Sequence, residues 1–145
     1  MKRQLPLLIF GLFVLSAVLS AVPAFAHHGF QFEYDGSKYV TITGVLRKIE
    51  WENPHIYFNV DVTGADGKVT SWRFEGSSVT LVRRSGVTLA DFNDNMGKTV
   101  SVHGCPARGG LPRVAAETVK LPGGREIVVA RQRYYGDGKP GPDDN

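Results

Sequence analysis

Hydrophobic and polar residues alternate along most of the chain from Lys38 onward, which predicts a protein built of β-strands. The hydrophobic positions within residues 40–46 follow one parity, those within residues 49–51 follow the other, and Gly44 stands where the alternation begins to fail. A one-residue slip of this kind is typical of a β-bulge, which glycine tolerates. The first strand is therefore predicted to be long and bent at Gly44.

The next two strands are predicted to form a hairpin. Glu52-Asn53-Pro54 interrupts the first strand, because proline lacks the amide donor that a strand ladder needs. Alternation then resumes over residues 56–62 and again over residues 69–75. The Gly64-Ala65-Asp66-Gly67 segment between them has the composition of a turn.

Two short helices and further strands are expected in the second half. Ser77-Ser78 can cap a helix that runs to Arg83-Arg84, and Gly86 can close it. Hydrophobic residues between Thr88 and Met96 have helical spacing, which favours a second helical piece. The remaining strands are predicted over residues 99–103, 113–121 and 126–130.

This order of elements is typical of a small OB-like barrel. The predicted fold class is all-β with minor α, a five- or six-stranded β-barrel with one or two short helical connections over residues 38–130. A β-sandwich is the alternative fold. Residues 27–37 are expected to form an N-terminal arm, and residues 131–145 a flexible tail with little to bury.

The first 26 residues have the features of a cleaved signal peptide. Met1-Lys2-Arg3 is basic, residues 7–19 are apolar, and Ala24-Phe25-Ala26 is a small-x-small cleavage site. A transmembrane anchor is the alternative, but Gly11, Ser16 and Pro23 interrupt the apolar stretch. We expect the mature protein in the periplasm or outside the cell, without a stable membrane anchor.

Charge and cysteine content narrow the functional classes. The chain has 17 Lys+Arg and 14 Asp+Glu, a formal net charge of +3, and two of the basic residues, Lys2 and Arg3, lie in the predicted signal peptide. A mature chain that is nearly neutral does not suit nucleic-acid binding, which needs a clear excess of basic side chains. The single cysteine, Cys105, excludes an intrachain disulfide.

Cleavage after Ala26 would make His27 the N-terminal residue, with an α-amine and an imidazole that can chelate one metal ion. Nitrogen ligands of this kind suit Cu(II), and the half-site is similar to the histidine brace of exported copper proteins. The third nitrogen can come from His28, His55 or His103. The alternative is a mobile arm that binds copper only adventitiously.

Aromatic residues follow the paired histidines. Phe30, Phe32 and Tyr34 alternate, so they are expected to tie the arm to the barrel by packing on it. This alternation favours an arm whose histidines are held in place.

Other side chains suggest further, weaker sites. His103 and Cys105 share a strand face by parity and can offer an imidazole and a thiolate to a soft cation, although a lone cysteine is often buried and inert. Trp51 and Tyr57 are predicted ligand-binding residues of an aromatic barrel face. Glu75, like the other carboxylates near these aromatics, is expected to be solvated.

Four stretches carry a resemblance to a known family: His27-His28-Gly29-Phe30, the Trp51-x-Asn53-Pro54-His55 string at the end of residues 41–55, Trp72-Arg73-Phe74-Glu75, and residues 102–110. They resemble a family of small exported bacterial proteins of unknown function. The architecture is also similar to that of periplasmic OB-fold stress proteins. The resemblance implies a fold and a location but no activity.

The expected function is therefore that of a periplasmic, non-enzymatic binding protein, with Cu(II) at His27 as the most specific version. The favoured protein would bind a small ligand or a metal ion. The alternative is a metal-free interaction or structural module of the envelope that uses a barrel edge or the Tyr57 face to bind a peptide or an envelope protein. A copper-dependent oxidase is a third possibility, and it would need the same brace with an open coordination position.

Overall fold

The structure, a computed structural model, describes residues 30–130, so the predicted signal peptide, His27, His28 and the predicted tail lie outside the described residues. Strands account for most of the regular secondary structure in the described chain. Its elements in chain order are α2 (Phe30–Glu33), β1 (Val40–Glu50), β2 (Tyr57–Thr63), β3 (Val69–Glu75), α3 (Val79–Arg84), α4 (Leu89–Asn93), β4 (Thr99–Pro106), the 3₁₀ turn η1 (Arg108–Gly110), β5 (Arg113–Lys120) and β6 (Glu126–Val128).

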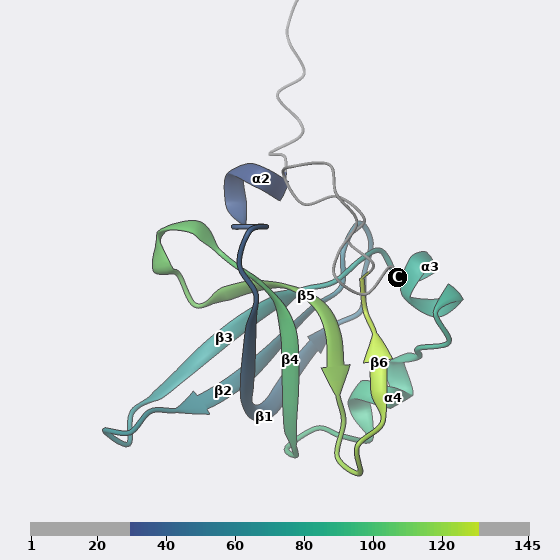
Figure 1. The fold of residues 1–145 in the computed structure, drawn as a ribbon. Coiled ribbons are helices and arrows are strands. Elements are labelled where there is room, and N and C mark those ends of the chain that lie inside the picture. The colour runs from purple at the N-terminus through teal and green to yellow at the C-terminus, as the bar shows by residue number, and fades with distance from the viewer. Residues whose placement is uncertain (1–29, 131–145) are drawn as a thin grey trace, which may run out of the picture.

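Five strands form a closed barrel and a sixth strand extends it (Figure 1). Neighbouring strands pair in the order β3-β2-β1-β4-β5-β6, and each of these pairs is antiparallel. The barrel closes where β3 pairs in parallel with β5, with Arg73 opposite Arg113 and Glu75 opposite Ala115. This arrangement confirms the predicted small all-β barrel of the OB-like kind.

β1 is long and bent, as predicted, but its bulge is not at Gly44. The β1–β2 register shifts between Leu46 and Lys48, so Arg47 is the extra residue. Gly44 keeps the parity of the inward positions, and a Cβ there would lie 2.3 Å from the Asp61 carbonyl oxygen. In the sequence, a glycine at this inward position looks like a break in the alternation. In the structure, the absence of a side chain lets β1 and β2 approach closely.

Two short helices connect β3 to β4, as predicted. The Ser78 side chain caps α3 by accepting a backbone N–H of its first turn, and Gly86 follows the helix with a φ of 80°. α4 begins with a capping box between Thr88 and Asp91. None of the helices within residues 30–130 is long and apolar enough to span a membrane.

The core fills the barrel interior and includes a side chain from α4. Phe58 of β2 and Phe74 of β3 stack with ring centroids 5.2 Å apart, and Phe92 of α4 packs against Phe58 at 5.2 Å. All three are fully buried. Because Phe92 packs into the core, α4 covers part of the barrel, and α2 lies well away from α4 (Figure 1).

Candidate functional site

The chain after α2 docks on the outer face of the barrel. Tyr34 forms an isolated antiparallel bridge with Ala107, and the Asp35 N–H donates to the Pro106 carbonyl oxygen at 2.9 Å. Tyr34 is only 4% exposed and packs in a small hydrophobic cluster that is separate from the barrel core. The cluster consists of Tyr34, Tyr39, Cys105, Ala107 and Ala115. The arm is therefore held on the barrel from Tyr34 onward.

Phe32 does not share in this docking. Its alternation with Tyr34 predicts an extended arm with both rings on the barrel, but residues 30–33 form a helical turn and Phe32 is 81% exposed. The prediction is confirmed for Tyr34 and wrong for Phe32, because residues two apart share a face in a strand and diverge in a helix, and the side chain of Phe30 lies outside the described part of the chain.

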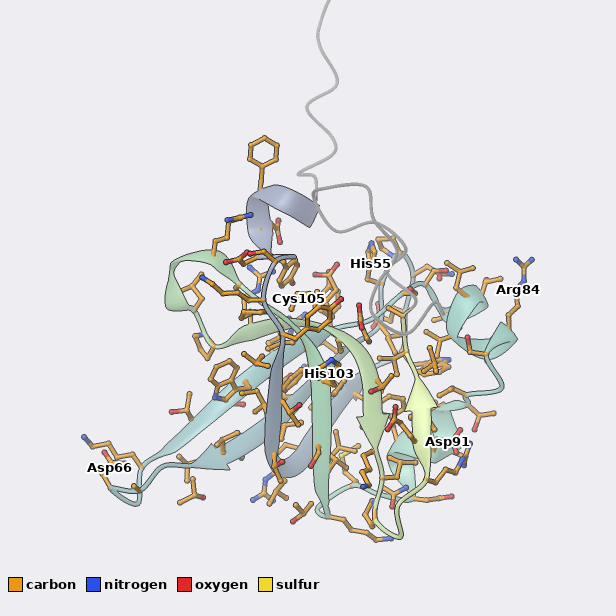
Figure 2. The ribbon with its side chains drawn as sticks, in the orientation of Figure 1. His55, Asp66, Arg84, Asp91, His103 and Cys105 are labelled. Carbon is orange, nitrogen blue, oxygen red and sulfur yellow. The ribbon has the colours of Figure 1, made fainter. Side chains whose placement is uncertain are left out.

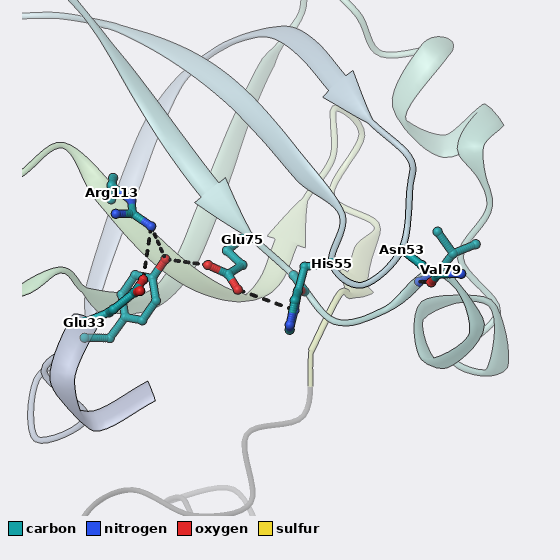
Figure 3. A network of polar contacts seen from close by, with 8 residues as sticks. Glu33, Asn53, His55, Glu75, Val79 and Arg113 are labelled. Carbon is teal, nitrogen blue, oxygen red and sulfur yellow. Dashed lines mark hydrogen bonds and ion pairs between the residues drawn. The ribbon is translucent and has the colours of Figure 1, made fainter. Parts of the chain in front are cut away.

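A chain of polar contacts runs from the arm to the β1–β2 loop (Figure 3). The Tyr34 hydroxyl donates to Glu75 Oε2 at 2.8 Å. On its other side, Arg113 Nη2 lies 3.4 Å from the Tyr34 oxygen and 3.2 Å from Glu33 Oε2. Burial, followed by the hydrogen bond to Glu75, raises the pKa of Tyr34 well above its ordinary value, so the hydroxyl remains a donor. Glu75 Oε1 then lies 3.4 Å from His55 Nδ1.

His55 has a defined tautomer at the end of this chain. Its Nδ1 lies 3.0 Å from the Gly76 carbonyl oxygen, which can only accept. Nδ1 therefore carries the proton, and the neutral ring has its lone pair on Nε2. The side chain is 46% exposed, and no residue between 30 and 130 forms a hydrogen bond with its Nε2.

The Trp51-x-Asn53-Pro54-His55 string forms the loop between β1 and β2 and anchors it at two points. Trp51 packs against the core, with its ring 5.9 Å from that of Phe92. Asn53 Oδ1 accepts the N–H of Val79, the first residue of α3, at 3.2 Å. These two contacts hold the loop while His55 points outward from it, as Figure 2 shows at the upper right of the barrel.

The predicted third-ligand candidates are placed in different surroundings. The His103 ring stacks on Tyr39 with centroids 5.0 Å apart, and its Nδ1 lies 3.1 Å from Thr41 Oγ1. His55 has none of these neighbours. Among residues 30–130, no three His, Cys, Asp or Glu side chains are grouped so as to hold a metal ion. His27 and His28 lie outside the described residues, so the described chain can supply only part of a site.

A model for a family of unknown function, DUF6152, matches residues 15–115. The chain belongs to DUF6152. The matched part contains the paired histidines, the Trp51-x-Asn53-Pro54-His55 string and Glu75, and it ends at Ala115, where β5 closes the barrel. This confirms the membership of an unknown-function family that the resemblance indicated. Neither a curated protein nor a solved structure matches the chain significantly.

Cys105 of this DUF6152 chain is fully buried. Burial is the largest cause that raises the pKa of its thiol to about 12, and the negative charge of Glu117 adds to it, while a hydrogen bond with Tyr39 opposes it. His103 shares the outer face with Cys105, as the parity predicts, but the thiol is covered and protonated at neutral pH. This surrounding disfavours a soft-metal or redox role in the folded protein.

Trp51 and Tyr57 lie on opposite faces of the sheet. Trp51 packs inward, and its buried indole Nε1 has no hydrogen-bond partner in the part of the chain that the structure describes. Tyr57 pairs with Glu50 in the outer register, and the Arg73 guanidinium sits 4.3 Å from its ring centroid. The two predicted ligand-binding aromatics of the DUF6152 barrel therefore do not make one surface, and only Tyr57 is on the outside.

Sequence reasoning missed the part that Tyr34, Glu75 and Arg113 play in this site. Glu75 was expected on a solvated face, but its side chain is 19% exposed and contacts Tyr34 and His55, so that expectation is wrong. The period-two pattern of β3 puts Glu75 outside the barrel correctly, yet it cannot indicate that the arm covers this position. In this chain the cover comes from Tyr34, which lies 41 residues before Glu75.

Proposed function

We propose that this protein is an exported, non-enzymatic binding protein of the periplasm that takes up Cu(II) through His27, with His55 as a further nitrogen ligand. The proposal of export rests on the basic start, the apolar run over residues 7–19 and the Ala24-Phe25-Ala26 cleavage site. Cleavage after Ala26 leaves the His27 α-amine and imidazole as a two-nitrogen chelate.

The observation that carries the proposal is the hydrogen bonding of the His55 ring. Its Nδ1 donates to the Gly76 carbonyl oxygen and lies near the Glu75 carboxylate, while Nε2 of the partly exposed ring has no hydrogen-bond partner within residues 30–130. Metal-binding histidines in proteins commonly have this arrangement, in which a carbonyl or carboxylate accepts from the nitrogen that does not bind the metal. His103 fits less well, because its ring is stacked on Tyr39.

The docked arm adds a limit on distance. His27 precedes Phe30, the first residue of α2, by three residues, and three residues span at most about 10 Å. The same arm contacts Glu75 through Tyr34, and Glu75 contacts His55. The tether therefore limits the distance from Phe30 at which the His27 nitrogens can bind a metal ion together with His55.

The chemistry of the donor set favours copper over other divalent ions. An amine and imidazoles are all nitrogen ligands, and Cu(II) binds such sets most tightly among the divalent first-row metals. His28 is adjacent to the chelate and can add its own ring or the intervening amide. The described carboxylates near His55 already have partners, which leaves a set dominated by nitrogen.

The test begins with protein exported through its own signal, whose first residue is checked by mass spectrometry and expected to be His27. Cu(II) titration should give one tight site, and a variant with one extra N-terminal residue should lose it. We expect His55→Ala to weaken binding by about 10-fold or more, while His103→Ala, the matched control, leaves it unchanged. A Cu(II) affinity that is the same in wild type, in the extended variant and in His55→Ala would refute the proposal.

A second candidate, a metal-free interaction module, is favoured by the surroundings of Tyr57. Its ring and the Arg73 guanidinium form a cation–π pair on the outer face of β2 and β3, the face with which OB barrels commonly bind ligands. If copper does not bind, the protein should retain an envelope component in pull-downs, and Tyr57→Ala should abolish that retention. A Thr63→Ala variant on the far end of β2 serves as the control.

A further inference from the structure

We infer that Glu75 is a positioning residue that couples the docked N-terminal arm to the orientation of His55. The inference rests on the proposed function in that it treats His55 as the metal ligand. It concerns a contact within the described chain, however, so it can be tested without any metal.

Glu75 occupies the point where three parts of the molecule meet. It is the last residue of β3, and it lies opposite Tyr57 of β2 on one side and Ala115 of β5 on the other. The arm covers it from outside through Tyr34. Its carboxylate is therefore largely withdrawn from water, and its hydrogen bonds have to come from protein groups.

The two carboxylate oxygens have different partners. Oε2 accepts from the Tyr34 hydroxyl at 2.8 Å, and Oε1 faces His55 Nδ1 at 3.4 Å. No lysine or arginine among residues 30–130 forms an ion pair with Glu75, because Arg113 lies on the far side of Tyr34 and pairs with Glu33. Tyr34 of the arm and His55 of the β1–β2 loop therefore both contact the carboxylate of Glu75.

Sharing makes the two contacts dependent on each other. If the Tyr34 hydroxyl is removed, both oxygens become available to His55, and the Nδ1–H tautomer becomes more favourable. If Glu75 becomes glutamine, one oxygen remains for two donors, and the amide N–H₂ opposes the Nδ1–H. The two substitutions should therefore shift the tautomer of His55 in opposite directions.

Both substitutions are expected to weaken the docking of the arm on the barrel. The Asp35 N–H, which donates to Pro106, follows Tyr34 directly and reports arm docking. Loss or weakening of the Tyr34–Glu75 bond should speed its hydrogen exchange by about 5-fold, the equivalent of a hydrogen bond of about 1 kcal/mol.

The experiment uses metal-free protein at about pH 8, where imidazole is ordinarily neutral. Long-range ¹H–¹⁵N spectra give the tautomer ratio of His55, and amide exchange gives arm docking, in wild type, Glu75→Gln and Tyr34→Phe. Glu50→Gln is the matched control, because Glu50 is an outer-face carboxylate that pairs with Arg73 instead. Amide spectra confirm that each variant is folded.

We expect the Nδ1–H fraction to fall in Glu75→Gln, by about 5-fold in the ratio, to rise in Tyr34→Phe, and to stay at the wild-type value in Glu50→Gln. A purely structural role would speed exchange at Asp35 without moving the His55 tautomer, and that result would overturn the inference. Copper titration separates the two proposals: absence of copper binding with the tautomer shifts intact overturns the proposed function alone. Copper binding without the shifts overturns the coupling alone.

Discussion

Replacement of Gly104 by alanine should open the barrel next to its closure. Gly104 lies in β4 opposite Ala116, where the β4–β5 register shifts. An added Cβ would lie 2.0 Å from the Ala115 carbonyl oxygen and 2.9 Å from the Ala116 Cα. Both obstacles are backbone atoms, so no side-chain rotation can relieve them and the two strands have to separate.

The size of the loss follows from that overlap. Bringing the Cβ to ordinary contact requires a local separation of about 1 Å or more, which costs about 1–3 kcal/mol as overpacking. A weakened ladder hydrogen bond adds about 1 kcal/mol. We expect the free energy of unfolding to fall by about 3 kcal/mol. The effect reaches the site, because Ala115 is in register with both Cys105 and Glu75.

Urea unfolding followed by the fluorescence of Trp51 and Trp72 measures this loss. Gly67→Ala is the matched control, since Gly67 sits in the β2–β3 turn with a φ of +79° and nothing within 4 Å of an added Cβ. It should cost about 1 kcal/mol, from backbone strain alone. A Gly104→Ala loss no larger than that of Gly67→Ala would refute the steric argument.

Three further predictions test single contacts. The hydrogen bonds from Arg73 and Lys48 lower the pKa of Glu50 to about 2. The stabilisation by the Glu50 carboxylate is therefore complete above its unfolded pKa of about 4.3 and is lost as the pH falls toward 2. In urea titrations, the difference in free energy of unfolding between wild type and Glu50→Gln should be larger at about pH 6 than at about pH 2.5. Cys105 should react with a thiol reagent about 100-fold more slowly in the folded protein than in urea, because its thiol is buried with a pKa raised to about 12; rapid labelling of folded protein would contradict this. Asn53→Ala should lower the free energy of unfolding by about 1 kcal/mol through loss of its bond to the start of α3, and an equal loss in Glu52→Ala would argue against that role.

Much of the fold could be predicted because its signals are local. Period-two alternation marked β2 and β3 at nearly their observed bounds, and Ser78 marked the start of α3. The errors came from residues whose local signal has two meanings. Gly44 was interpreted as the point where the alternation breaks, but it allows two strands to approach closely. Phe32 was interpreted as a residue of an extended segment, but it lies in a helical turn.

The candidate site divides in the same way. The Trp51-x-Asn53-Pro54-His55 string was visible in the sequence as a strand break with a histidine after it, so His55 could be proposed directly. The tautomer of its ring could not be predicted, because it depends on Glu75 at the end of β3 and on the carbonyl of Gly76 that follows it. Parity placed Tyr57 outside, whereas Trp51, predicted on the same aromatic face, packs against the core.

The sequence by itself determined the strands of the barrel, the two short helices between β3 and β4, and that the barrel is small and all-β, but not the helical turn of the arm. Only the tertiary structure decided which outer residues meet. Glu75 contacts Tyr34 across 41 residues because β3 closes in parallel on β5 and the arm crosses that closure. Periodicity records the direction of a side chain relative to its own strand. It contains no information on which distant segment will cover that side chain, since this depends on how the whole barrel closes.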